Sequence, residues 1–162
     1  MFKKIALTVL IMMLIVSPAF ADWTITVSKP ESEPWKNGQR MNMISISLVS
    51  DGTDLAEFSL VTAITNSGLN APDIIKQIHG GVLYEVVTDP GVEPDGTYTL
   101  AFDCYREGSL LDMAALSATV TEHTNFAKDL GYSPVFWNDL KIDIGDIGSA
   151  ADSVVIEIYI VK

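Results

Sequence analysis

Apolar and polar residues alternate with a period of two along most of the chain that follows residue 21. The alternation is found in the segments 23–27, 44–48, 58–64, 98–102, 136–144 and 154–160, with a weaker candidate at 117–124, and residues 82–88 are rich in β-branched residues. This period is typical of half-buried strands. Turn-forming Gly, Pro, Asp and Asn separate the segments, and no long segment repeats every 3.6 residues. The pattern predicts an all-β fold, an antiparallel β-sandwich of jelly-roll or immunoglobulin-like type, rather than an α/β fold.

Two short segments predict helices within this sandwich. Residues 72–78 begin with a proline and an acid and are followed by two glycines, which are start and stop signals of a helix. Residues 109–115 are rich in Leu and Ala. Residues 28–39 contain two prolines and a glycine among charged residues, so we expect a loop or an edge-crossing segment there. One or two short helices are therefore expected.

The last alternating segment is apolar on both of its faces. Val154, Ile156 and Ile158 share one face, whereas Val155 and Tyr159 lie on the other. Such a strand is covered on both sides, either as a central strand of the sheet or by a neighbouring subunit. We favour the central strand.

Residues 1–21 have the features of a secretory signal peptide. Lys3 and Lys4 precede an apolar segment at 5–16, and Ala19 and Ala21 occupy the positions that a signal peptidase reads. The apolar segment is shorter than the about 20 residues needed to span a membrane. No cysteine follows it, so we do not expect a lipoprotein anchor. We expect cleavage, export to the periplasm or the medium, and a single mature domain at 22–162.

Composition and charge exclude several classes of partner. The chain of 162 residues has a net charge of −11, and loss of Lys3 and Lys4 with the leader gives −13. Nucleic acids and anionic membrane surfaces attract basic proteins, so we expect neither as a partner. A single cysteine excludes an internal disulfide and a cysteine-based zinc site.

The chain does not show a catalytic constellation. It has two histidines, His79 and His123, and it contains no Gly-x-Ser-x-Gly motif. The carboxylates are scattered, so their pairing for hydrolysis cannot be read from the sequence. We therefore expect neither catalytic residues nor a cofactor, and we expect the protein not to be an enzyme.

Two acidic turns are candidates for calcium binding. They contain Asp139, Asp143, Asp146 and Asp152 in one case, and Asp51 and Asp54 in the other. Oxygen-rich turns can hold calcium, but neither turn has the spacing of an EF-hand loop. Acidic turns are more often solvated loops, so we expect no metal site.

Three further side chains are open to more than one interpretation. Cys104 is expected to be a half-buried small hydrophobe, although a disulfide to another chain is the alternative. Trp35 and Trp137 are candidates for a contact surface that binds a partner or a sugar ring. Trp137 is out of phase with Phe136 and Leu140, so it lies either on a polar contact face or in a second buried layer.

The second half of the chain carries an ordered series of turn and strand motifs. They are Gly81–Gly91 (GVLYEVVTDPG), 94–100 (PDGTYTL), 103–112, Ser117-Ala118-Thr119, Tyr132-Ser133-Pro134-Val135, and the segments 140–142 and 154–161. In this order, residues 81–162 resemble small phage-type virion proteins found among tail and head accessory genes. The resemblance implies a β-sandwich with a structural role, and it implies no active-site residue. The chain departs from it at 113–116, where those proteins have a glycine-rich segment with a basic residue.

We therefore expect an exported, non-enzymatic β-sandwich with a structural, assembly or docking role. Its expected partner is a protein, either a second copy or a larger assembly, and an exported relative of virion proteins would carry a leader. The alternative is a secreted or periplasmic ligand-binding module, possibly for carbohydrate. A hydrolase is the least favoured hypothesis, because hydrolases show a denser polar constellation.

Overall fold

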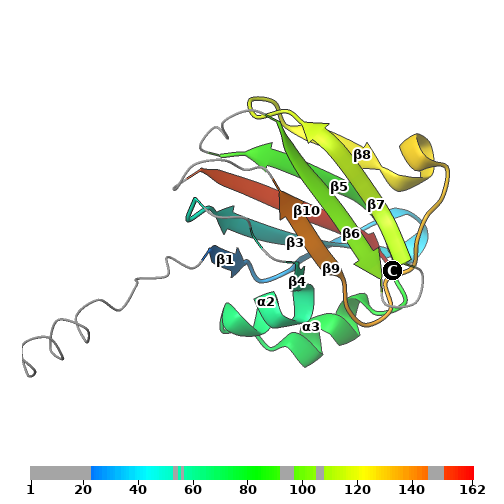
Figure 1. Cartoon of the computed structure of the whole chain (residues 1–162). Coiled ribbons are helices and arrows are strands. Elements are labelled where there is room, and N and C mark those ends of the chain that lie inside the picture. Colours follow the sequence, from blue (N-terminus) through cyan, green and yellow to red (C-terminus); the bar gives the residue numbers. More distant parts are fainter. Residues whose placement is uncertain (1–22, 53–54, 56, 92–96, 105–107, 146–151) are drawn as a thin grey trace, which may run out of the picture.

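A computed structural model describes residues 23–52, 55, 57–91, 97–104, 108–145 and 152–162. The expected leader at 1–21 lies outside these residues. Two antiparallel sheets face each other, and two helices lie side by side beneath them (Figure 1). The predicted antiparallel β-sandwich is confirmed. In the described residues, no helix is long and apolar enough to cross a membrane.

The two sheets differ in size, and all of their strand pairs are antiparallel. Sheet A has the order β1-β3-β10-β5-β8, with β2 also paired to β3. Its strands are β1 (Thr24–Val27), β2 (Glu31–Pro34), β3 (Arg40–Val49), β5 (Val82–Pro90), β8 (Glu122–Asn125) and β10 (Ser153–Val161). Sheet B has the order β4-β9-β6-β7. Its strands are β4 (Phe58–Ser59), β6 (Tyr98–Cys104), β7 (Gly108–Leu116) and β9 (Lys141–Gly145).

The helices α2 (Leu60–Asn66) and α3 (Ala71–Ile78) follow β4 in the chain. The helix predicted at 72–78 is thus confirmed as α3, which buries Ile74 and Ile78. Shorter turns are a 3-10 turn at Lys36–Gly38 and a π-helical turn at Phe126–Leu130.

Aliphatic and aromatic side chains fill the space between the sheets. The inward face of β10 is fully buried (Val154, Ile156, Ile158 and Ile160), and sheet B contributes Tyr98, Leu100 and Phe102. β10 pairs with β3 on one side and β5 on the other. The prediction of a central last strand is therefore confirmed, because both edges of β10 are occupied within sheet A.

The strand predicted at 58–64 is wrong, because only Phe58 and Ser59 are extended and α2 follows. Leu60, Ala63 and Ile64 are all buried, and this spacing places them on one helical face. Leu60 and Ile64 therefore fit both the two-residue period of a strand and the 3.6-residue period of a helix. The Ser59 hydroxyl accepts a hydrogen bond from the Thr62 N–H at 3.2 Å, and this N-cap starts the helix.

The helix predicted at 109–115 is also wrong. This segment belongs to β7, which pairs with β6 from Tyr98 to Cys104. Leu and Ala are good helix formers, but intrinsic propensity is a weak determinant of structure, and pairing with a neighbouring strand overrides it here.

Two other predicted strands are shorter in the structure than in the prediction. The segment 117–124 is extended only at its end, in β8, and the segment 136–144 is extended only in the part that belongs to β9. The segment before β9 is connected to β5 by a single bridge between Val135 and Val82. The loop predicted at 28–39 contains the short strand β2.

Candidate functional site

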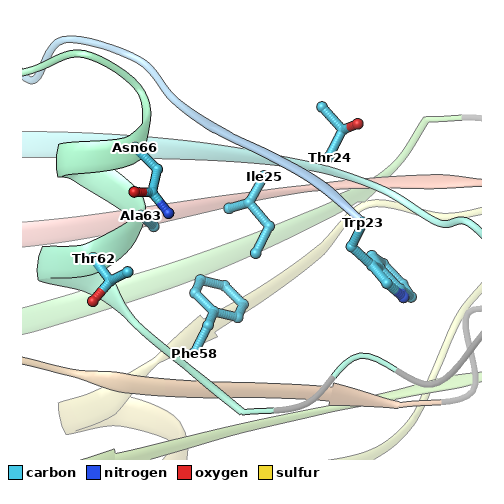
Figure 2. Close-up of a pocket in the computed structure, with 7 residues that line it drawn as sticks. All are labelled: Trp23, Thr24, Ile25, Phe58, Thr62, Ala63 and Asn66. Atoms are coloured by element: carbon cyan, nitrogen blue, oxygen red, sulfur yellow. The ribbon is translucent and has the colours of Figure 1, made fainter. Parts of the chain in front are cut away.

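β1 is an edge strand of sheet A and β4 is an edge strand of sheet B. An open cleft lies beside these two strands, on the same side of the sandwich. Its volume is about 390 Å³, within the usual range of ligand pockets. It is lined by Trp23, Thr24, Ile25, Phe58, Thr62, Ala63 and Asn66. Figure 2 shows Ile25 and Phe58 pointing toward one another, with Asn66 and Thr62 on α2 at one end and Trp23 at the other. We call it the β1 cleft.

The outer edge of the β1 backbone is partly open beside this cleft. The Ser28 N–H donates to the Ser45 carbonyl of β3 at 2.9 Å, whereas the Val27 N–H donates to the Ser67 hydroxyl at 2.7 Å. Successive N–H groups of a strand alternate in direction. The N–H and carbonyl of Ile25 therefore point away from β3, and the described residues provide no partner for them. The cleft thus adjoins unpaired main-chain donors and acceptors.

β1 and β2 lie along the same edge of β3 but differ in how that edge is protected. β2 carries Glu31, Glu33 and Pro34, which are the charges and proline that natural edge strands use against unwanted pairing. β1 has the sequence Thr-Ile-Thr-Val and has no such residue. The β1 half of this edge is therefore the part able to accept another strand.

Asp139 fixes α2, which forms one wall of the cleft. Its Oδ2 accepts a hydrogen bond from the Ser59 hydroxyl at 2.6 Å, and its Oδ1 accepts from the N–H groups of Val61 at 3.1 Å and Leu140 at 2.9 Å. A carboxylate at this position satisfies the free N–H groups of the first helical turn and complements the helix dipole. Asp139 thus positions the helix.

The other acidic residues considered for calcium lie apart from one another. Asp143 is exposed on β9, Asp152 is buried before β10, and Asp51 is half-buried. Asp54 and Asp146 lie outside the described residues. In the part of the chain that the structure describes, no three His, Cys, Asp or Glu side chains come together as a metal site.

The two histidines occupy separate places, and each has a local partner. His79 follows α3, and its Nδ1 donates to the carbonyl oxygen of Trp137. His123 is on β8 with its Nδ1 3.2 Å from Glu85 Oε1. Cys104 ends β6 opposite Gly108, and nothing of its side chain is described.

The tryptophans singled out by the sequence have different aromatic partners. Trp35 is half-buried and meets the Tyr84 ring edge-on, with the ring centroids 5.5 Å apart, and Lys36 Nζ lies 5.5 Å from the Trp35 centroid. Trp137 meets the His79 ring edge-on at 5.7 Å and packs in part against the core. Of the two interpretations of Trp137, this packing fits the buried layer better.

The outer face of sheet A carries carboxylates around Tyr159. The Tyr159 hydroxyl donates to Glu157 Oε2 at 2.7 Å. Across the strands, Tyr159 is opposite Met43 and Glu85, and Met43 is opposite Glu31. Burial first, and then the Glu157 hydrogen bond and the charges of Glu157, Glu85 and Glu31, raise the pKa of Tyr159 to about 12.

This shift predicts an alkaline loss of stability. Because the pKa of Tyr159 rises from 10.0 when unfolded to about 12 when folded, its contribution is present below pH 10 and is lost as the pH rises toward 12. Unfolding at a series of pH values should therefore show a smaller alkaline loss in Tyr159→Phe than in the parent. Glu157→Gln should lower the pKa of Tyr159 in a spectroscopic titration. An unchanged titration curve would mean that Glu157 does not act on this hydroxyl.

The β1 cleft was not anticipated from the sequence. The alternation along the chain places Trp23, Ile25 and Phe58 in strands and does not indicate that they meet. The sequence matches no protein-family model and no curated protein.

Proposed function

We propose that the protein is an exported, non-enzymatic β-sandwich with an assembly role, and that it associates with a second copy of itself through the β1 edge. The observation that carries the proposal is the unprotected β1 edge beside an apolar cleft. Main-chain groups of an added strand would supply hydrogen bonds, and its alternate side chains would enter the cleft. The resemblance of residues 81–162 to virion accessory proteins supports a role of this kind.

A second copy fits this edge because two β1 strands can pair antiparallel about a two-fold axis. Such an interface uses the same patch on both copies. Thr24, Ile25, Thr26 and Val27 carry no charge, so two β1 strands meet without local repulsion. The whole mature chain, at −13, still repels its copies over a longer range.

The polar side chains favour association over catalysis. His79 and His123 lie on separate elements, and their ring nitrogens contact the Trp137 carbonyl and Glu85. Asp139 is bound to the start of α2. None of these contacts joins a histidine to a hydroxyl nucleophile, which acyl transfer requires.

A ligand-binding module, possibly for carbohydrate, is the second candidate. It is supported by the half-exposed Trp35–Tyr84 pair, since aromatic faces stack on sugar rings. Trp35 is the better residue to test, because Trp137 packs in part against the core and its loss would also affect stability. Glycan binding that is lost in Trp35→Ala would favour this candidate.

Sedimentation velocity of the purified protein tests the assembly proposal. We expect a dimer that strengthens between low salt and about 1 M salt, where charge repulsion is screened to about 3 Å. Ile25→Lys should weaken this dimer by about tenfold or more, because it places a charge in the cleft beside the edge.

Thr26→Lys is the matched control, since it adds the same charge on the outer face of the same strand. Asn66→Lys on the exposed side of α2 should also weaken the dimer, and it provides a second test if Ile25→Lys does not fold. A monomer at every salt and protein concentration would overturn the proposal. Equal weakening by Ile25→Lys and Thr26→Lys would also overturn it.

A further inference from the structure

A groove beside α3 gathers positive charge in this acidic protein. One hollow of about 130 Å³ is lined by Ser32, Arg40, Asn42, Gln77 and Lys162. A second hollow of about 240 Å³ includes the apolar side chains of Pro30, Leu69 and Ile74, together with Lys29 and Asp73. Gln77 lines both hollows, so they are neighbours on either side of its side chain. We call the two together the α3 groove.

Arg40 and Lys162 form a pair of like charges across two strands. The Arg40 N–H donates to the Lys162 carbonyl at 2.7 Å, and the Lys162 N–H donates to the Arg40 carbonyl at 2.9 Å. The two residues thus extend the β3–β10 ladder by one step, with their side chains on the same face. Like charges directly opposite one another destabilise a sheet, so this arrangement calls for a counter-charge.

The side chains of both cations donate hydrogen bonds to neutral groups. Arg40 donates through Nε to the Ser32 hydroxyl at 2.8 Å and through Nη2 to the Ser32 carbonyl at 3.0 Å. Lys162 Nζ donates to the Lys76 carbonyl at 3.1 Å. Among the described residues, the ion pairs are those of His123, Lys128 and Lys141. Among the described residues, no carboxylate side chain therefore forms an ion pair with Arg40 or Lys162.

The alternation along β2 places its two carboxylates on the face of the sheet opposite to the side chains of Arg40 and Lys162. On β2, Ser32 is opposite Asn42 and shares its face, whereas Glu31 and Glu33 point to the other face of the sheet. In the second hollow, Asp73 Oδ2 accepts a hydrogen bond from Asn70 Nδ2 at 2.7 Å.

Two amide side chains complete the first hollow. Asn42 is only 2% exposed, and its Oδ1 accepts a hydrogen bond from Gln77 Nε2 at 2.8 Å. This contact fixes the orientation of both amides. Each amide nitrogen carries two N–H donors, so the second N–H of Gln77 can serve a bound group. Asn42 Nδ2 in turn donates to the Ile160 carbonyl at 3.5 Å, so Gln77 is the amide with a donor left for a ligand.

We propose that the α3 groove binds a small organic anion, with its carboxylate or phosphate head between Arg40 and Lys162 and its apolar body against Pro30, Leu69 and Ile74. The guanidinium fork and the ammonium group suit both kinds of oxyanion. The first hollow has the volume of about four water molecules, which is enough for one head group. The contiguous second hollow provides the room and the apolar lining for the body.

Calorimetric titration at low salt tests the proposal with acetate, butyrate, hexanoate, hexyl phosphate and inorganic phosphate. We expect the carboxylates to bind more tightly with length, by about fourfold for each buried methylene group. Two comparisons of affinity show which head group the site prefers. One compares hexanoate with hexyl phosphate, and the other compares acetate with inorganic phosphate. Arg40→Gln and Lys162→Gln should each weaken hexanoate binding by about tenfold.

Lys128→Gln is the matched control, because it removes one charge from an exposed site on another turn. Equal weakening by all three variants would overturn the site, since it would indicate general charge attraction. Absence of saturable binding by every probe would also overturn it. Binding without dependence on chain length would overturn the assignment of the apolar body.

Gln77→Glu gives an independent test, because it places a carboxylate in the groove as an internal counter-charge. We expect this variant to lose hexanoate binding, because its carboxylate repels an anionic head group. The change also removes the Nε2 donor to Asn42 Oδ1, so the test is the binding and not the melting temperature. Unchanged hexanoate binding would contradict the proposal.

Discussion

Replacement of Ile156 by alanine is expected to lower the free energy of unfolding by about 2–5 kcal/mol, the range measured for such truncations in closed cores. Ile156 is fully buried in β10 and lies opposite Ile46 on β3 and Thr88 on β5. Because both neighbouring strands hold the backbone in place, the structure can relax little around the lost atoms. Chemical denaturation followed by tryptophan fluorescence measures the effect, with an unchanged slope as the sign of two-state unfolding.

Val155→Ala is the control for this experiment, because Val155 precedes Ile156 and points to the half-exposed outer face. Its loss should cost about 1 kcal/mol or less. If both variants were destabilised equally, the assignment of the inner and outer faces of β10 would be wrong.

Replacement of Asp139 by alanine should have the second largest effect, a loss of about 2–3 kcal/mol in unfolding free energy. The Ser59 hydroxyl and the N–H groups of Val61 and Leu140 would lose their shared acceptor. Because α2 forms a wall of the β1 cleft, we also expect weaker self-association in this variant.

Asp143→Ala provides the matched control for Asp139. It removes the same charge from an exposed position on β9, and it should change stability by less than about 0.5 kcal/mol. Asp139→Asn should recover part of the loss, since its amide oxygen can accept one of the three hydrogen bonds. If Asp139→Ala and Asp143→Ala lowered the free energy of unfolding by a similar amount, the loss of a negative charge, rather than the loss of the α2 cap, would be the cause.

The strands that the sequence predicted well are those with a single possible period. In β10, apolar residues on both faces indicated a central strand, and its two neighbours in sheet A confirm it. In α2, by contrast, Leu60 and Ile64 fit a strand with Phe58 and a helix with Ala63. Besides the local cap at Ser59, the start of the helix is held by Asp139, which is distant in the sequence and which no local pattern connects to α2.

The candidate sites were harder to predict than the fold, because each joins segments that are far apart in the chain. The β1 cleft combines Trp23 and Ile25 with Phe58 and α2. The α3 groove depends on Arg40 and Lys162, which become neighbours only when β3 pairs with β10. A single sequence holds no signal for such a pairing of cations, whereas Trp35 and Trp137 stand out by size alone.

The order of strands in sheet A has a consequence for the timing of folding. β10 follows every other described strand in the chain, yet it fills the place between β3 and β5. During synthesis, one edge each of β3 and β5 therefore remains unpaired until β10 has been made. Pairing between segments so distant in the chain is also slow. A nascent chain that cannot close its larger sheet early stays extended for longer. This would suit the export that the sequence of residues 1–21 predicts, because a finished sheet would have to unfold before translocation.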